Sequence, residues 1–199
     1  MSVMRMAPTD HPVLDVIAGR WSPRAISARP VEREKLASLF EAARWAPSSF
    51  NEQPWRYVFA TRERPGDFDR LAGLLVESNA WARQAAVLAL SVAKLTWSRN
   101  GKPNRHALHD VGAASLSMFL QATSVGLCMH EMAGFDVARA RVELEIPDDH
   151  EPVAMIAIGY PGDPASLPDS QRASESAPRR RQPITAWVLE GSWKTPARF

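Results

Sequence analysis

The order of helical and strand patterns along the chain predicts an α+β fold. Apolar residues spaced for helices and short apolar runs suited to strands are mixed, without the strict alternation of a doubly wound sheet. Two runs, residues 85–93 and 153–158, are apolar almost throughout, as is typical of strands buried on both faces. No internal repeat is visible. A chain of 199 residues with this pattern is expected to form one domain, residues 1–199.

Helices are predicted where apolar residues recur on one face between capping and terminating residues. Asp10 is a candidate cap for the first helix, and Gly19 follows it. Pro47 is expected to end the second helix, because the residue before a proline disfavours helical geometry. Gly126 is placed to end the longest helix, and Asp136 to cap the last one. The predicted helices cover residues 11–18, 31–46, 67–77, 106–125 and 134–144.

Strands are predicted from β-branched, aromatic and continuous apolar runs. They cover residues 55–60, 85–93, 153–158 and 184–189. Residues 163–182 are rich in proline, serine and charge, so we expect an extended connection there. Together with the apolar stretch after it, this connection makes residues 163–199 a C-terminal arm. Such an arm is expected to pack away from its own body, and a partner subunit is a natural receiver for it.

Composition narrows the class of protein. The chain has 24 basic and 22 acidic residues, a balance too even to indicate nucleic-acid binding. It has one cysteine and therefore no internal disulfide, and its first residues do not read as a signal peptide. The apolar run 85–93 is too short for a membrane helix. We expect a cytoplasmic protein that does not bind membranes.

Several kinds of chemistry find no support in the sequence. Neither of the glycine-rich phosphate-binding loops is present, and the G-x-S-x-G pattern of serine hydrolases is absent. The spacing of His106, His109, Cys128 and His130 matches no strong zinc signature, so no metal site is predicted.

Three separated segments carry clusters of polar side chains. Arg20-Trp21-Ser22-Pro23-Arg24 places two guanidinium groups and a hydroxyl in five residues, which suits an anion site because arginine binds phosphate bidentately. Residues 46–55 form a polar loop rich in amides and hydroxyls and bracketed by prolines, which favours a ligand loop over an ordinary turn. Residues 179–181 are all arginine. Taken alone, the first and third segments also fit solvated loops.

Together, these segments resemble the nitroreductase family of FMN-dependent oxidoreductases. The resemblance runs from about residue 13 to 193 and keeps the family's order. Its most specific part is the segment Ala46-Pro47-Ser48-Ser49-x-Asn51-x-Gln53-Pro54-Trp55. The other matching segments are Arg20-x-Ser22-x-Arg24, Asn79-Ala80-Trp81, Met132-Ala133-Gly134-Phe135-Asp136, residues 153–162 and Arg179-x-Arg181-x-Pro183.

The resemblance implies a central, mostly antiparallel sheet flanked by helices and an FMN bound at the interface of a homodimer. Arg20, Arg179 and Arg181 would neutralise the FMN phosphate, with Ser22 as a neutral donor. Arg24 would place a cation near N1 and the C2 carbonyl of the flavin, where charge accumulates on reduction. Trp21, where the family often has an arginine or a histidine, would bind the flavin through its main chain and without a side-chain charge.

Further flavin contacts follow from the same resemblance. Asn79 would bind the ring edge or the ribityl chain, and the main chain of Met132, Ala133 and Gly134 would face N5. A second group would reach the FMN of the other subunit: Pro47, Ser48, Ser49 and Asn51. Residues 94–110 are expected to line the outer pocket or else to be an exposed, polar start of a helix.

The implied reaction is ping-pong, with NADH or NADPH reducing FMN before a nitroaromatic, quinone or similar acceptor takes its place. No side chain is required as a nucleophile. Two other interpretations stay open: a specialised enzyme of the same fold (a dehalogenating, dehydrogenating or flavin-cleaving type), and a flavin-binding protein without turnover.

Overall fold

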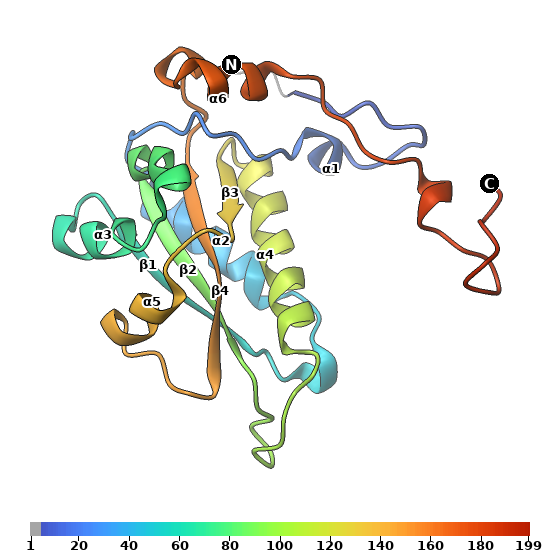
Figure 1. The fold of residues 1–199 in the computed structure, drawn as a ribbon, viewed down its shortest axis with the longest axis horizontal. Helices are drawn as coiled ribbons and strands as arrows, with labels where there is room; N and C mark the ends of the chain where they lie inside the picture. The colour runs from blue at the N-terminus through green and yellow to red at the C-terminus, as the bar shows by residue number, and fades with distance from the viewer. Residues whose placement is uncertain (1–4) are drawn as a thin grey trace.

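A four-stranded antiparallel sheet forms the centre of the molecule in the computed structural model, which describes residues 5–199 (Figure 1). The strands are β1 (Trp55–Thr61), β2 (Val87–Lys94), β3 (Cys128–Met132) and β4 (His150–Gly159), in the order β1-β2-β4-β3. The α+β class predicted from the sequence is confirmed.

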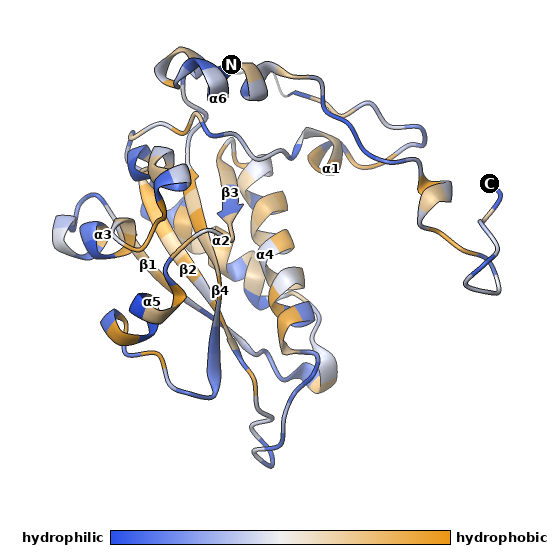
Figure 2. Ribbon diagram, in the orientation of Figure 1, coloured by the Kyte–Doolittle hydropathy of each residue, from blue (hydrophilic) through white to orange (hydrophobic). Residues whose placement is uncertain are grey.

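Helices cover both faces of this sheet. On one face lie α2 (Arg33–Arg44) and the long α4 (Ala107–Ser124). On the other lie α3 (Pro65–Ala72), α5 (Val137–Glu143) and the 3-10 segment η2 (Glu77–Gln84). Successive residues of β2 point to opposite layers: Val87 joins the α4 layer and Leu88 the α3 layer. Figure 2 shows the resulting concentration of hydrophobic residues along the strands.

Apolar periodicity and capping residues in the sequence explain where helices α2 and α5 form. Three residues of α2, at i, i+3 and i+7, are buried against the sheet: Leu36, Leu39 and Ala43. Asp136 caps α5, as predicted, because its side chain accepts a hydrogen bond from the main-chain N–H of Arg139 at 2.9 Å.

The first and third helices differ most from their predicted bounds. The first helix, α1, spans only Asp15–Gly19, and Leu14 rather than Asp10 precedes it. Residues 11–14 are exposed, so no packing offsets the cost of starting a helix there. The predicted helix 67–77 ends earlier, at Ala72, and η2 follows it. In addition, β3 was not predicted, because the run Cys128–Met132 contains a histidine and a glutamate.

The predictions for the end of the chain were wrong in two respects. Residues 163–182 are not simply extended: they contain the 3-10 turn η3 (Pro164–Ser166) and α6 (Asp169–Ser176). Residues 184–189 form no strand of the sheet but begin with the 3-10 turn η4 (Ile184–Ala186), and Leu189 makes only an isolated bridge to Pro196. An apolar stretch that lies off the sheet has no strand neighbour in its own chain to complete a ladder.

The segment that follows α6 lies beside the N-terminal segment. After running along the N-terminal segment the chain leaves the body of the molecule (Figure 1), and the ring centre of Phe199 at its end lies 6.4 Å from the ring centre of His11. Within the part that the structure describes, no helix combines the length and hydrophobicity needed to cross a membrane.

Candidate functional site

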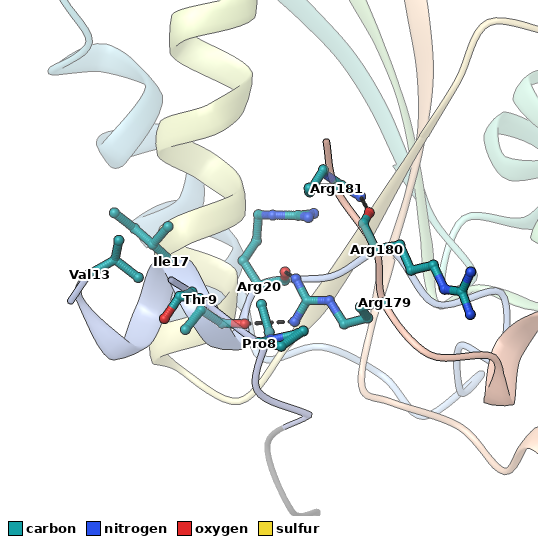
Figure 3. Close-up of a pocket in the computed structure, with 10 residues that line it drawn as sticks. Pro8, Thr9, Val13, Ile17, Arg20, Arg179, Arg180 and Arg181 are labelled. Atoms are coloured by element: carbon teal, nitrogen blue, oxygen red, sulfur yellow. Dashed lines mark hydrogen bonds between the residues drawn. The ribbon is translucent and has the colours of Figure 1, made fainter. Parts of the chain in front are cut away.

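A cavity of about 260 Å³ lies where the two ends of the chain meet (Figure 3). Its walls come from residues 7–9, from α1 and the residues flanking it, and from residues 179–181. The fold therefore brings Arg20 and the C-terminal arginines together, although about 160 positions separate them. Figure 3 shows Arg20 and Arg179 next to each other, with Arg180 pointing away.

Arg20 is half-buried in this cavity. Its Nη1 lies 3.3 Å from Ser22 Oγ, and its guanidinium stands 5.5 Å from the ring centre of Phe119 on α4. Burial lowers the pKa of Arg20, and the positive charge of Arg181 lowers it further. A guanidinium that is partly desolvated beside another cation is a strong attractor for an anion.

Arg179 uses its guanidinium differently. Nη1 donates to the carbonyl oxygens of Arg5 and Ala18 at 2.7 and 2.6 Å, and Nη2 donates to that of Arg20 at 2.6 Å. Three of the five N–H groups of this arginine are thus engaged by the main chain. Arg179 adds charge to the cavity and fastens the arm to the N-terminal segment.

The cavity carries a net positive charge. Burial lowers the pKa of Arg179, and the neighbouring Arg20 and Arg181 lower it too. Among residues 5–199, none of these three guanidinium groups forms an ion pair with a carboxylate. A dianion such as a phosphate monoester has the charge that this group of arginines lacks.

Arg24 lies outside the cavity, on the loop that follows α1. Its main-chain N–H donates to both carboxylate oxygens of Glu175, and its Nη1 lies 3.4 Å from Ser174 Oγ. Glu175 is 4% exposed and was not singled out from the sequence, where it is one acid in a serine-rich stretch. Trp21, the residue that departs from the family's usual one, packs against Arg5, whose guanidinium stands 5.2 Å from the indole centre.

Asn79 and Gly134, each expected to contact the flavin, are in direct contact with each other. Asn79 Nδ2 donates to the Gly134 carbonyl at 2.9 Å. A Cβ atom on Gly134 would lie 2.8 Å from that Nδ2 and 2.9 Å from Val76 Cγ2, so only glycine fits without displacing them. Met132 is buried in the layer below.

The polar loop before β1 is well ordered by its own contacts. The main-chain N–H of Ser49 donates to Asp110 Oδ2 at 3.1 Å, and that of Gln53 donates to Ser48 Oγ at 3.0 Å. Phe50 and Asn51 have φ values of 52° and 56°, in the left-handed region that few residues other than glycine adopt.

This loop and the arginine cavity do not meet within one chain. The loop contacts Asp110 near the start of α4, whereas Arg20 packs on Phe119 nearer its end. Nine residues of helix correspond to roughly 13 Å. A single chain therefore leaves Pro47, Ser48, Ser49 and Asn51 apart from Arg20.

Two further titratable groups lie on β3, beside these segments. Burial lowers the pKa of His130, whose Nδ1 lies 3.0 Å from the Pro23 carbonyl and whose ring packs on Trp81. Burial raises the pKa of Glu131, with Ser115 and Arg20 acting in the opposite direction. Sequence reasoning considered His130 only as a possible metal ligand and missed Glu131, because the strand that carries both was not predicted.

The sequence matches the family model described as "Nitroreductase family" over residues 17–80 and 74–160. The chain belongs to the nitroreductase family. The match includes the Arg20–Arg24 segment, the polar loop, Asn79 and Gly134. It does not extend to the C-terminal arginines, whose place in this nitroreductase is established by the geometry above.

Known relatives agree with this assignment. A Streptomyces griseus protein that carries the provisional name NADH dehydrogenase/NAD(P)H nitroreductase is 31% identical over 165 residues, covering 73% of this chain and 83% of that protein. A crystal structure described as an oxidoreductase containing FMN has a TM-score of 0.90 at 34% identity, covering 95% and 96% of the two chains. A nitroreductase-like protein from Desulfovibrio desulfuricans, solved in complex with FMN, has a TM-score of 0.70 at 26% identity, covering 93% and 99%.

Proposed function

We propose that this nitroreductase binds FMN and passes reducing equivalents from NADH or NADPH to small electrophilic acceptors. The observation that carries the proposal is the group of arginines without carboxylate partners, Arg20, Arg179 and Arg181, gathered from both ends of the chain around one cavity. FMN ends in a phosphate dianion, which suits that charge. The FMN-containing relatives of the same fold support the assignment.

The chemistry of the residues present fits FMN. Arg20 and Arg181 have N–H groups available for the phosphate, Ser22 adds a hydroxyl, and Arg179 contributes mainly its charge. In this proposal Arg24 faces the pyrimidine edge of the ring. When bound, FMN supplies the group that accepts and returns hydride.

The ring itself would lie against β3 and the turn after it. Asn79 holds the Gly134 carbonyl, and the absence of a side chain at Gly134 lets Asn79 and Val76 pack directly against this turn, which fixes the main chain that would face the ring. Met132 and Ala133 complete this wall. None of these residues is needed as a nucleophile, and protons for the product can come from solvent.

A second copy of the chain is proposed to complete the site. The cavity of about 260 Å³ is smaller than the roughly 300–1,000 Å³ that small-molecule sites usually provide. One face of α4 is uncovered, with Leu108 and Leu116 both 52% exposed and Gly112 between them. Pairing of two chains over this face would carry the loop containing Pro47, Ser48, Ser49 and Asn51 toward the other chain's flavin.

The C-terminal arm gives the proposed dimer a second contact. Trp187 and Trp193 are 63% and 89% exposed on a segment that leaves the body. The outer edge of β1 borders an apolar groove lined by Phe40, Ala43, Trp55, Arg56, Tyr57 and Phe59. We propose that the arm of one subunit covers this groove on its partner, since both surfaces are apolar and unpaired.

The proposal is tested by titrating the purified full-length protein with FMN and by steady-state kinetics. Saturable quenching of flavin fluorescence at one FMN per chain is expected. With nitrobenzene derivatives or quinones as acceptors, initial rates at several acceptor concentrations should give parallel double-reciprocal lines, the pattern of a ping-pong mechanism. A protein that takes up no FMN would refute the proposal, and one that binds FMN without turnover would be a flavin carrier or sensor.

A further inference from the structure

Glu175 is a buried acid whose partners are main-chain N–H groups. Its side chain, at the end of α6, is among the few buried charged groups of residues 5–199. Its Oε1 accepts from the N–H of Arg24 at 3.1 Å and from that of Ala25 at 3.0 Å, and its Oε2 accepts from Arg24 at 3.0 Å. Hydrogen bonds to an ionised carboxylate are about twice as strong as neutral ones, which compensates its removal from water.

These contacts fix the main chain that carries Arg24. The carbonyl of Ala25 accepts from the N–H of Gly162 at 2.7 Å, so the loop is held from α6 on one side and from the turn after β4 on the other. The Arg24 side chain also stays close to α6, since its Nη1 lies 3.4 Å from Ser174 Oγ. Without the carboxylate, the N–H groups of Arg24 and Ala25 would lose the acceptor that orients this loop.

The charge of Glu175 argues against a direct role at the flavin. A carboxylate close to the ring would oppose the negative charge that the ring gains on reduction. Fixing the loop has the opposite consequence, because it keeps the Arg24 guanidinium directed at that charge. Removing the carboxylate would therefore raise the reduction potential if Glu175 acted directly on the ring, and lower it if Glu175 acts by holding Arg24. The sign of the change distinguishes the two roles.

We propose that Glu175 is a positioning residue, which holds the Arg24 loop in the orientation that stabilises reduced flavin. This inference rests on the proposed FMN function. It also assigns a task to α6: the helix fastens the C-terminal segment to the loop through Glu175, while Arg179 fastens it to the N-terminal segment through three carbonyl groups.

The test compares Glu175→Gln with Asp169→Asn in the full-length holoprotein. Asp169 lies on the same helix, but its side chain is 95% exposed, so the control makes the same acid-to-amide change in solvent. The reduction potential is measured by anaerobic equilibration with a reference dye. We expect Glu175→Gln to disfavour the reduced flavin roughly tenfold, a lowering of about 30 mV for a two-electron couple. Asp169→Asn should leave the potential unchanged.

Two further variants make the result decisive. In an Arg24→Ala background, Glu175→Gln should shift the reduction equilibrium less than twofold, because it acts through the missing guanidinium. Glu175→Asp keeps the charge but shortens its reach, so it should lower the potential in the same direction and serves as the readout if Glu175→Gln does not fold.

An unchanged or raised potential in Glu175→Gln would overturn the inference, as would an undiminished effect in the Arg24→Ala background. Loss of FMN from both Glu175 variants would also overturn it, because a role confined to Arg24 leaves the phosphate contacts intact. Failure of the unmodified protein to bind FMN would instead refute the proposed function.

Discussion

Gly134→Ala tests the contact on which the proposed flavin wall depends. The added Cβ would lie 2.8 Å from Asn79 Nδ2 and 2.9 Å from Val76 Cγ2, well inside normal contact distance. Asn79 would have to turn away and give up its hydrogen bond to the Gly134 carbonyl, which costs about 1 kcal/mol. Overpacking destabilises the folded state by a further amount of about 1–3 kcal/mol. In the opposite direction, alanine restricts the unfolded chain more than glycine does, which stabilises the folded state by about 0.5–1 kcal/mol. The net loss of unfolding free energy is then about 2 kcal/mol.

The assay is thermal unfolding, followed by circular dichroism, with FMN titration of the same samples. For a chain of this size, a loss of about 2 kcal/mol corresponds to a fall in Tm of roughly 4–8 °C. Gly66→Ala is the matched control, because a Cβ there meets nothing within 4 Å and the position is in the first turn of α3. Its Tm should be unchanged or slightly higher. Equal melting temperatures for the two variants would refute the steric argument, and unchanged FMN affinity in Gly134→Ala would argue against the proposed wall.

Three other predictions follow from the site. Arg20→Ala should weaken FMN binding tenfold or more, whereas Arg24→Ala should chiefly lower the flavin reduction potential; equal effects on both properties would contradict this division. Cys128 should not react with thiol reagents at pH 8 until the protein is unfolded, because burial raises the pKa of its thiol to about 12. Burial also lowers the pKa of His130, so its neutral form is favoured on folding. The stability from this residue should be present above pH 6.5 and be lost as the pH falls through the lowered value, and His130→Gln should flatten that dependence in urea unfolding between pH 7.5 and 5.5.

The sequence predicted the fold where local pattern and tertiary packing agree. The runs that became β2 and β4 are apolar because both faces of the sheet are covered, and α4 is long enough for its periodicity to be clear. The strand β3 escaped prediction because His130 and Glu131 interrupt its apolar pattern at the edge of the sheet. The terminal stretch 184–189 has the composition of a strand, but within the described residues only an isolated bridge from Leu189 to Pro196 pairs with it.

The site was predictable to the extent that its residues form short motifs. The motif containing Asn79 and the one containing Gly134 were expected to contribute to one site, and the structure joins them. The hydrogen bonds from Arg179 to three main-chain carbonyl groups could not be predicted, since a run of three arginines does not show which side chain faces inward. Glu175 was missed for a similar reason: its partners are main-chain N–H groups, which leave no mark in the sequence.

In the proposed function a nicotinamide reduces a flavin held by this chain. The most direct test of this step is anaerobic stopped-flow absorbance at about 450 nm, with the FMN-loaded full-length protein mixed with NADH or NADPH and no acceptor present. We predict first-order bleaching with at least one of the two donors, at a rate that saturates with donor concentration. A flavin that stays oxidised with both donors, while dithionite bleaches it fully, would contradict the proposed function.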